Sequence, residues 1–421
     1  MTRTVDSRYA WMRLVISLTL MTIGGCGMYV VIVVLPEVQT EFGVARGQAS
    51  LPFTWTMIGF GLGGILMGRL SDRHGIIVPV SIGSVALAGG FVAAAFAPNL
   101  LVFMIVQGAV IGFLGSSATF SPLIADISFW FLRRRGIAVA ICASGSYLAG
   151  TVWPPVVQAF IESFGWRSTY IGIGIFCLVT MLPLAMLLRA PRPAATSLPV
   201  SPAEVAATAG SPASVDSPLG LKPGILLALL CVAGVACCVA MAMPQVHILA
   251  YCVDLGYGPA RGAVMLSVML GFGVVSRLVF GLICDRIGGL RTLLLGSVLQ
   301  TIALALFLPF DSLASLYVIS ALFGLFQGGI VPAYAIVVRD FFPPAIAGAR
   351  VGMVITSTLL GMALGGWMSG AIFDLTGSYD AAFVNGIVWN LVNAAIVLWL
   401  LKRAGGAGLL RPLRAPRPAM A

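Results

Sequence analysis

Charged side chains are scarce in this sequence of 421 residues. Asp, Glu, Lys and Arg make up only 9% of it, whereas apolar residues make up 59%. Because a soluble globular domain carries about 25% charged residues, the composition excludes an ordinary soluble domain. Histidine is scarcer still, with two copies in the chain. Without a buried carboxylate pair, a nucleotide-binding loop or a metal-ligand cluster in the sequence, we expect neither an enzyme nor a cofactor.

The eight cysteines lack the spacing of a metal or disulfide framework. Almost all of them fall inside apolar runs, and no CxxC pair occurs. Paired spacings are what zinc sites and small disulfide-bonded domains require. We therefore expect no metal site, and we interpret these cysteines as small packing residues between helices.

Long apolar runs are what the sequence has in abundance. About 20 residues are needed to cross the roughly 30 Å of bilayer hydrocarbon as a helix. The sequence predicts an all-α membrane protein with twelve such helices, arranged as two pseudo-symmetric six-helix bundles. The predicted spans are 11–35, 50–70, 77–97, 100–124, 137–159, 167–188, 224–252, 261–284, 291–309, 313–338, 350–373 and 381–402.

The basic residues predict the orientation of these spans. All but four of the 24 Lys and Arg residues fall in segments that face the cytoplasm if both termini are inside. The four exceptions are Arg46, Arg167 and Arg261 in outer loops and Arg277 within a span. Basic residues are enriched in cytoplasmic loops, so we expect a multi-pass protein of the inner (plasma) membrane with cytoplasmic termini. The net charge of +10 reflects these loops and does not indicate nucleic-acid binding.

One polar segment divides the chain in two. Residues 190–222 are rich in Pro, Ala and Ser and offer little to bury, which is typical of a cytoplasmic linker. The expected domains are therefore an N-terminal bundle over 1–189, this linker, a C-terminal bundle over 223–403 and a basic cytoplasmic tail over 404–421. We expect a monomer embedded in the lipid bilayer.

A short motif recurs in the two halves. Gly68, Leu70, Asp72, Arg73 and Gly75 follow the second span, and Gly281, Asp285, Arg286 and Gly288 follow the eighth. Repeated six-helix halves with a site between them are a common plan of transporters. With this duplicated motif, the whole chain resembles the major facilitator superfamily, which implies transport by alternating access.

The charges of this motif are gating candidates. Asp72, Arg73, Asp285 and Arg286 are placed to bridge neighbouring helix ends at the inner face. Asp126 and Asp340, at the inner ends of the fourth and tenth spans, are the expected partners of Arg73 and Arg286, respectively. The alternative is that these charges only fix topology at the membrane surface.

Several further segments carry a narrower resemblance. Residues 126–136, 143–145, 164–167, 244–251 and 373–379 are similar to the monocarboxylate transporter family and to its oxalate–formate antiporter relatives. The resemblance implies a small organic anion as substrate, with protons as a further transported species. It also implies that an Arg of the eighth span holds the substrate carboxylate, a position that Arg277 matches.

Arg277 is the strongest candidate for substrate binding on physical grounds as well. It lies in the apolar run 262–285, about 12 Å along a helix from Asp285. A guanidinium at bilayer depth is costly unless it faces a cavity or a partner, so such residues are usually functional. Its planar fork suits a carboxylate. The alternative is an Arg that snorkels to the inner surface.

His247 matches a family histidine near the substrate. An imidazole titrates near neutral pH, so it can donate a hydrogen bond or carry a coupling proton; a packing histidine is the alternative. Pro244, three residues earlier, is expected to open the helix. Two departures weaken proton coupling by the route of the animal members: Gly273 replaces their Asp, and the first span has no Lys.

Other lining candidates rest on position and polarity. Besides Arg277 and His247, the expected substrate-binding residues are Tyr334, Phe120, Thr119 and Tyr29, with Tyr147, Asn385 and Asn390 as further candidates. Phe120 and Tyr334 each lie two residues from a proline, Pro122 and Pro332, where helices are often irregular. Structural packing is the alternative for each of these side chains.

The charge count favours one class of substrate. The oxalate antiporter relatives use a second cation in the eleventh span, but no Lys or Arg occurs between 351 and 373 here. One cation balances one carboxylate, so we predict a secondary transporter for a small monocarboxylate such as lactate, pyruvate or formate. Proton symport and anion exchange remain open. The alternatives are an efflux transporter for an amphipathic compound, an oxalate-type dicarboxylate antiporter and a non-transporting membrane sensor.

Overall fold

Helices form nearly all of the computed structural model, which describes residues 5–131, 134–190 and 219–406. Within these ranges no strand occurs. In chain order the elements are α1 (Arg8–Gly24), α2 (Cys26–Val33), α3 (Leu35–Phe42), α4 (Arg46–Ala49), α5 (Leu51–His74), α6 (Ile77–Ala95), α7 (Leu100–Ile105), η1 (Val106–Gly115), η2 (Ser116–Thr119), α8 (Ser121–Trp130), α9 (Arg135–Phe164), α10 (Trp166–Leu187), α12 (Pro223–Asp254), α13 (Pro259–Ile287), α14 (Gly289–Leu306), α15 (Leu313–Gln327), α16 (Ile330–Phe341), α17 (Pro344–Thr376) and α18 (Asp380–Gly406).

The predicted all-α membrane protein is confirmed. Twelve helical stretches of the described chain are long and apolar enough to span a bilayer, and each overlaps one of the twelve predicted spans. Most of the expected linker 190–222 and of the expected tail 404–421 lies outside the described residues.

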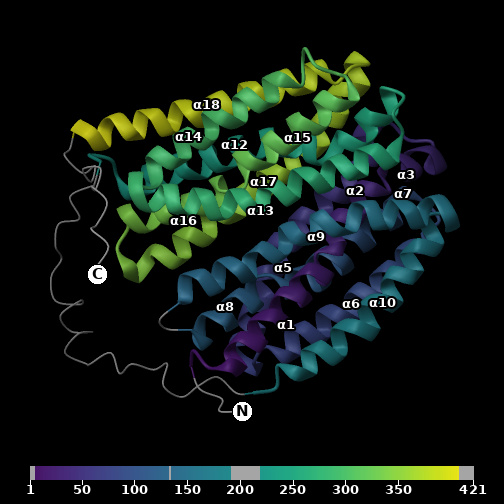
Figure 1. The fold of residues 1–421 in the computed structure, drawn as a ribbon, viewed down its shortest axis with the longest axis horizontal. Coiled ribbons are helices and arrows are strands. Elements are labelled where there is room, and N and C mark those ends of the chain that lie inside the picture. Colours follow the sequence, from purple (N-terminus) through teal and green to yellow (C-terminus); the bar gives the residue numbers. More distant parts are fainter. Residues whose placement is uncertain (1–4, 132–133, 191–218, 407–421) are drawn as a thin grey trace.

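The helices form two groups that lie side by side in Figure 1. Elements α1 to α10 form one group, the N-terminal half, and α12 to α18 form the other, the C-terminal half. The halves meet mainly where α13 packs on α9 and where α17 packs on α4 and α5. We call the end where α1 begins and α18 ends the terminal end, and the opposite end, with α3 and α4, the far end.

Glycines bring helices of the N-terminal half into backbone contact. A Cβ atom on Gly59 of α5 would lie 2.1 Å from the carbonyl oxygen of Gly108, and one on Gly63 would lie 2.0 Å from that of Phe113. Small residues permit such close approach between spanning helices. The partner segment, η1, is a π-helix, and the chain breaks its helical geometry at Phe120, where φ is −112° and ψ is −81°.

The helices are irregular at two of the three places where prolines predicted it. The fourth span changes from π-helix to 3₁₀-helix just before Pro122, and the tenth span is interrupted between α15 and α16, just before Pro332. The third prediction is wrong, because α12 continues through Pro244 to Asp254. A proline costs only its own N–H bond and a local clash, which neighbouring helices in a bundle can offset.

Candidate substrate site

Arg277 projects from α13 toward α9 and so reaches from the C-terminal half to the N-terminal half. Its Nη1 donates a hydrogen bond to the carbonyl oxygen of Ala143, at 2.8 Å. Its Cζ lies 4.1 Å from the centre of the Tyr147 ring, within the range of a cation–π interaction. No ion pair of Arg277 with a carboxylate occurs among the described residues.

The Nε side of the guanidinium is unpaired. Nε is buried and has no hydrogen-bond partner within the described chain. Arg13 shows in the same protein what this side can hold, since its Nε and Nη2 donate to the two carboxylate oxygens of Asp126 at 2.6 and 3.0 Å. Buried donors are rarely left unpaired in proteins. The unpaired Nε of Arg277 is therefore a candidate donor to an arriving carboxylate.

Two tyrosines and two glycines shape the surroundings of this guanidinium. A Cβ atom on Gly273 would lie 2.4 Å from ring atoms of Tyr147, so the bare backbone of α13 admits that ring. Tyr29 of α2 packs in the same way against Gly150 of α9, at 2.7 Å from the position of a Cβ atom. Tyr29 lies close enough to Tyr147 and Arg277 to interact electrostatically. Elements α2, α9 and α13 thus bring Tyr29, Tyr147 and Arg277 together between the halves.

The other residues expected to line the site make hydrogen bonds and ring contacts that do not involve Arg277. The Tyr334 hydroxyl is fully buried and donates to Oδ1 of Asn393 at 2.7 Å, inside the C-terminal half. The Thr119 hydroxyl donates to the carbonyl oxygen of Ser116 at 2.8 Å. The Phe120 ring packs against that of Phe60, with centroids 5.6 Å apart. Each of these contacts is one that the packing alternative predicts.

His247 is completely buried on α12, and both of its ring nitrogens have partners. Nε2 lies 2.8 Å from the carbonyl oxygen of Gly366, and Nδ1 lies 3.1 Å from the hydroxyl of Tyr379. Because a carbonyl only accepts, Nε2 carries the proton in the neutral ring, and Nδ1 accepts from Tyr379. The imidazole is thereby part of a larger polar network.

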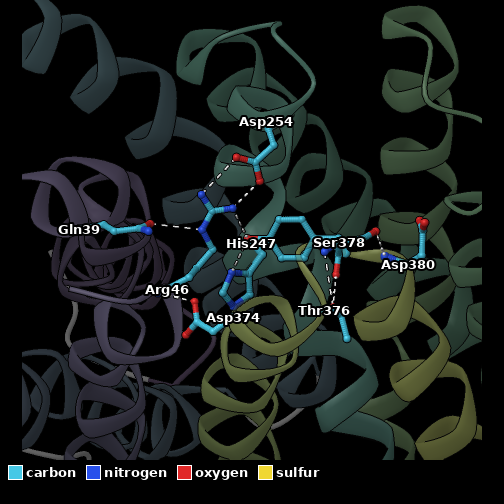
Figure 2. Close-up of polar contacts among 9 residues, drawn as sticks. Gln39, Arg46, His247, Asp254, Asp374, Thr376, Ser378 and Asp380 are labelled. Carbon is cyan, nitrogen blue, oxygen red and sulfur yellow. Dashed lines mark hydrogen bonds and ion pairs between the residues drawn. The ribbon is translucent and has the colours of Figure 1, made fainter. Parts of the chain in front are cut away.

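That network joins the two halves at the far end (Figure 2). Arg46 of α4 forms an ion pair with Asp254 at the end of α12, and its Nη1 donates to the Tyr379 hydroxyl at 3.2 Å. The carboxylate of Asp374, on α17, accepts from the backbone N–H groups of Arg46 and Gly47 at 2.8 and 2.7 Å. We call Arg46, Asp254, Asp374, Tyr379 and His247 the far-end network.

Tyr379 occupies the loop between α17 and α18, and it is nearly fully buried there. Burial raises the pKa of its phenol above the ordinary value, although the neighbouring Arg46 guanidinium acts in the opposite direction. The hydroxyl therefore stays protonated. A neutral phenol is what the network needs, because it accepts from Arg46 and donates to His247 at the same time.

The charges of the terminal end differ from expectation in one pairing. Asp126 was expected to meet Arg73, but it binds Arg13, whose side chain is 1% exposed. Arg13 also donates to the carbonyl oxygen of Leu188 at 3.0 Å and lies over the ring of Trp130. Arg73 is exposed. Arg13 projects from within α1 and reaches the buried Asp126. Arg73 lies in the exposed last turn of α5 and does not.

The remaining gating candidates lie at the surface of the terminal end. Asp72, Asp285, Arg286 and Asp340 are all exposed. Asp340 lies beside the start of α14, with its Oδ2 3.5 Å from the position of a Cβ atom on Gly289.

Sequence reasoning missed the roles of Arg13 and Arg46, because both were counted as loop cations. One signal was available for Arg13. Asp126 is the single charge of the run SPLIADISFW, and a lone carboxylate in a span requires a cation. No comparable signal marks Arg46, since its partners lie about 200 and more than 300 residues away.

Twelve helices of the described chain are long and apolar enough to span a membrane, and they form two bundles that meet at α9, α13 and α17, which is the architecture of two-bundle membrane transporters. The comparisons agree with this class. The chain belongs to the Major Facilitator Superfamily, whose family pattern it matches over residues 17–312 and 225–419.

Relatives with curated names are similar over most of the chain. Monocarboxylate transporter 13 of Rattus norvegicus is 26% identical over 366 residues, which cover 86% of this chain and 82% of the relative. An MFS-type transporter of Penicillium oxalicum is 27% identical, covering 81% and 78% of the two chains. The chain thus resembles the monocarboxylate transporter family within the superfamily.

Solved structures show the same fold at low identity. The peptide transporter POT in complex with sulfate superimposes with a TM-score of 0.72 at 14% identity, covering 97% of this chain and 98% of that one. The nucleoside transporter NupG gives a TM-score of 0.70 at 13% identity, covering 93% and 99%. These likenesses establish the fold alone.

Proposed function

We propose that the protein is a secondary active transporter of a small organic monocarboxylate, such as lactate, pyruvate or formate, and that Arg277 binds the carboxylate. The observation that carries this proposal is the buried, unpaired Nε of Arg277 at the interface of the halves. The similarity to monocarboxylate transporters supports the same substrate class. Tyr29, close to Arg277, completes the site from α2.

The number of available cations favours a single negative charge on the substrate. Three other arginines of the described chain hold a carboxylate of another helix: Arg13 holds Asp126, Arg46 holds Asp254 and Arg167 holds Glu41. Arg350, in the first turns of α17, lies over the ring of Phe342. Arg277 is not neutralised in this way within the described residues. A dicarboxylate would bring a second charge into a low-dielectric site without a cation to offset it, which is costly.

The arrangement of the halves supports alternating access. Contacts of α17 with α4 and α5 run from Gly370, against Arg46 of α4, to Leu359, against Gly61 of α5, and they cover the half of α5 that is nearer the far end. The far-end network reinforces this closed end. We propose that the network opens when the halves rock, while the charges of the terminal end (Asp72, Arg73, Asp126, Asp285, Arg286 and Asp340) act as the opposing gate. We propose that both termini face the cytoplasm and that the protein lies in the plasma membrane, because this orientation puts most basic residues on the cytoplasmic side.

One relative supports an alternative. An agnestin efflux protein of Paecilomyces divaricatus is 24% identical over 339 residues. Export of an amphipathic compound would use the apolar surface of a cavity and would not need a lone cation. Uptake measurements with several carboxylates distinguish monocarboxylate transport from export of an amphipathic compound.

The proposed function is tested by uptake into proteoliposomes. The purified protein is reconstituted and offered labelled L-lactate, pyruvate, formate and oxalate, with and without an inward proton gradient. We expect uptake of the monocarboxylates and little uptake of oxalate. A stimulation by the gradient indicates symport, and stimulation by internal anion alone indicates exchange. Oxalate uptake as fast as that of lactate contradicts the charge count, and no uptake of any monocarboxylate contradicts the proposed function.

A further inference from the structure

Arg277 makes two contacts with α9 that do not involve a substrate. Nη1 rests on the carbonyl oxygen of Ala143, and one face of the guanidinium rests on the Tyr147 ring. Both partners belong to α9, in the opposite half of the molecule. Both are neutral groups, a carbonyl dipole and an aromatic quadrupole, and they leave the Nε edge unused.

We propose that Ala143 and Tyr147 stand in for the substrate carboxylate when the site is empty, so that the empty protein changes access and carries out net transport, not obligatory exchange. This inference rests on the proposed function and specifies its mode. Tyr147 is in this account a positioning residue that acts through Arg277.

The physical reason lies in the cost of an unpaired cation. During the change of access, the site is closed on both sides, so fewer water molecules solvate Arg277. An unpaired guanidinium would then be strongly unfavourable, and only the protein with bound substrate would change access. A carbonyl and a ring partly replace the solvent. A carboxylate binds a guanidinium more strongly than either, so the substrate still displaces or supplements them.

The location of the contact keeps these partners available in both orientations. Elements α9 and α13 also meet farther along, where the Ser267 hydroxyl donates to the carbonyl oxygen of Thr151. Arg277 and Ala143 lie on the terminal side of that contact. When the far end opens, the terminal ends of the halves approach each other, so the guanidinium remains against α9.

Gly273 fixes how the Tyr147 ring lies against Arg277. It lies one helical turn before Arg277, and a Cβ atom there would meet two Tyr147 ring atoms at 2.4 Å. Without a side chain at 273, the ring rests directly on α13 beneath the guanidinium. A larger residue at 273 would push the ring away from Arg277.

The inference is tested by comparing two efflux rates in proteoliposomes loaded with labelled L-lactate. Efflux into lactate-free medium measures net transport, and efflux into unlabelled lactate measures exchange, with ionophores clamping pH and membrane potential. For Tyr147→Leu, we expect the ratio of net to exchange rate to fall about tenfold, the effect of losing a desolvated cation–π contact. Tyr147→Phe keeps the ring and should keep the ratio. Tyr317→Leu, on α15, is the matched control and should also keep it.

Each result decides between the two proposals. If Tyr147→Leu slows both rates in the same proportion, or neither, Tyr147 is only structural and the inference is wrong. Gly273→Ala serves as a second variant if the Leu variant does not fold, and the same fall in ratio is expected. An unaltered protein that exchanges lactate but shows no net efflux also overturns the inference while leaving the proposed function intact. Absence of both rates in the unaltered protein, with lactate, pyruvate and formate alike, rejects the proposed function, and the inference with it.

Discussion

Three arginines show how neighbours decide the role of a charge. Arg13 is fully buried and holds Asp126 with two hydrogen bonds. Arg46 is buried and holds Asp254. Arg277 has a backbone carbonyl and a ring in place of a carboxylate. The sequence predicted the site only for Arg277, because its depth in an apolar run is a local property. The partners of Arg13 and Arg46 follow from the packing of distant segments.

At the residue scale, the first prediction concerns the buried pair of Arg13 and Asp126. Arg13→Ala leaves an unpaired carboxylate among α1, α8 and α10, which should destabilise the protein by about 3–5 kcal/mol. The measurement is thermal unfolding of the purified protein in detergent. Arg189→Ala, an exposed arginine that bonds only Met186 among the described residues, is the control. A midpoint equal to that of the control would show that the pair contributes no stability.

The second prediction concerns His247. In the neutral ring, Nδ1 accepts from Tyr379; a protonated ring reverses this bond and places a positive charge near Arg46. Protonation would therefore weaken the far-end network, which is how this group would couple a proton to the opening of the far end. His247→Ala should flatten the dependence of lactate uptake on pH. An unaltered pH profile would remove His247 from proton coupling.

At the scale of helices, the spans were predictable and their irregularities were only partly so. Hydropathy located all twelve spans because crossing a bilayer demands long apolar helices. The prolines indicated breaks near Phe120 and before Pro332, but the same reasoning was wrong for Pro244. Whether a proline interrupts a helix depends on the groups packed around it. That environment is set by helices distant in sequence, so single-sequence reasoning does not supply it.

The third prediction tests the glycine contact between α5 and η1. A methyl group at Gly63 would lie 2.0 Å from the carbonyl oxygen of Phe113, so Gly63→Ala must push the two segments apart. We expect a loss of about 1–3 kcal/mol of stability or more, as for an overpacked core. Gly68→Ala on the same helix meets nothing within 4 Å and is the control. Equal thermal midpoints for the two variants would contradict the close packing.

At the scale of the whole molecule, the far-end network links the two halves through an ion pair, Arg46 with Asp254. It connects α4 to α12 and α17, and through Tyr379 it reaches His247 on α12. The sequence suggested His247 as a substrate contact. The structure adds that this histidine is tied to the interface of the halves, a relation that depends on residues from four separate segments.

The fourth prediction follows from this link. Arg46→Gln removes the ion pair with Asp254, so the population with an open far end should grow. Spin labels on the exposed residues Thr40 and Ser312, one in each half, report the separation by pulsed electron resonance. Arg167→Gln breaks a comparable pair, with Glu41, inside the N-terminal half and should leave the distances unchanged. Identical distance distributions for the two variants would contradict the role of the network.

The most direct measurement is lactate uptake by proteoliposomes that contain Arg277→Ala or Arg277→Lys, compared with Arg261→Ala on the exposed end of the same helix. Loss of a charge-assisted bidentate contact is expected to lower uptake about a hundredfold or more in both Arg277 variants, because an ammonium lacks the planar fork. Arg261→Ala should transport at close to the unaltered rate. Unimpaired uptake by properly folded Arg277→Ala protein would show that the carboxylate binds elsewhere.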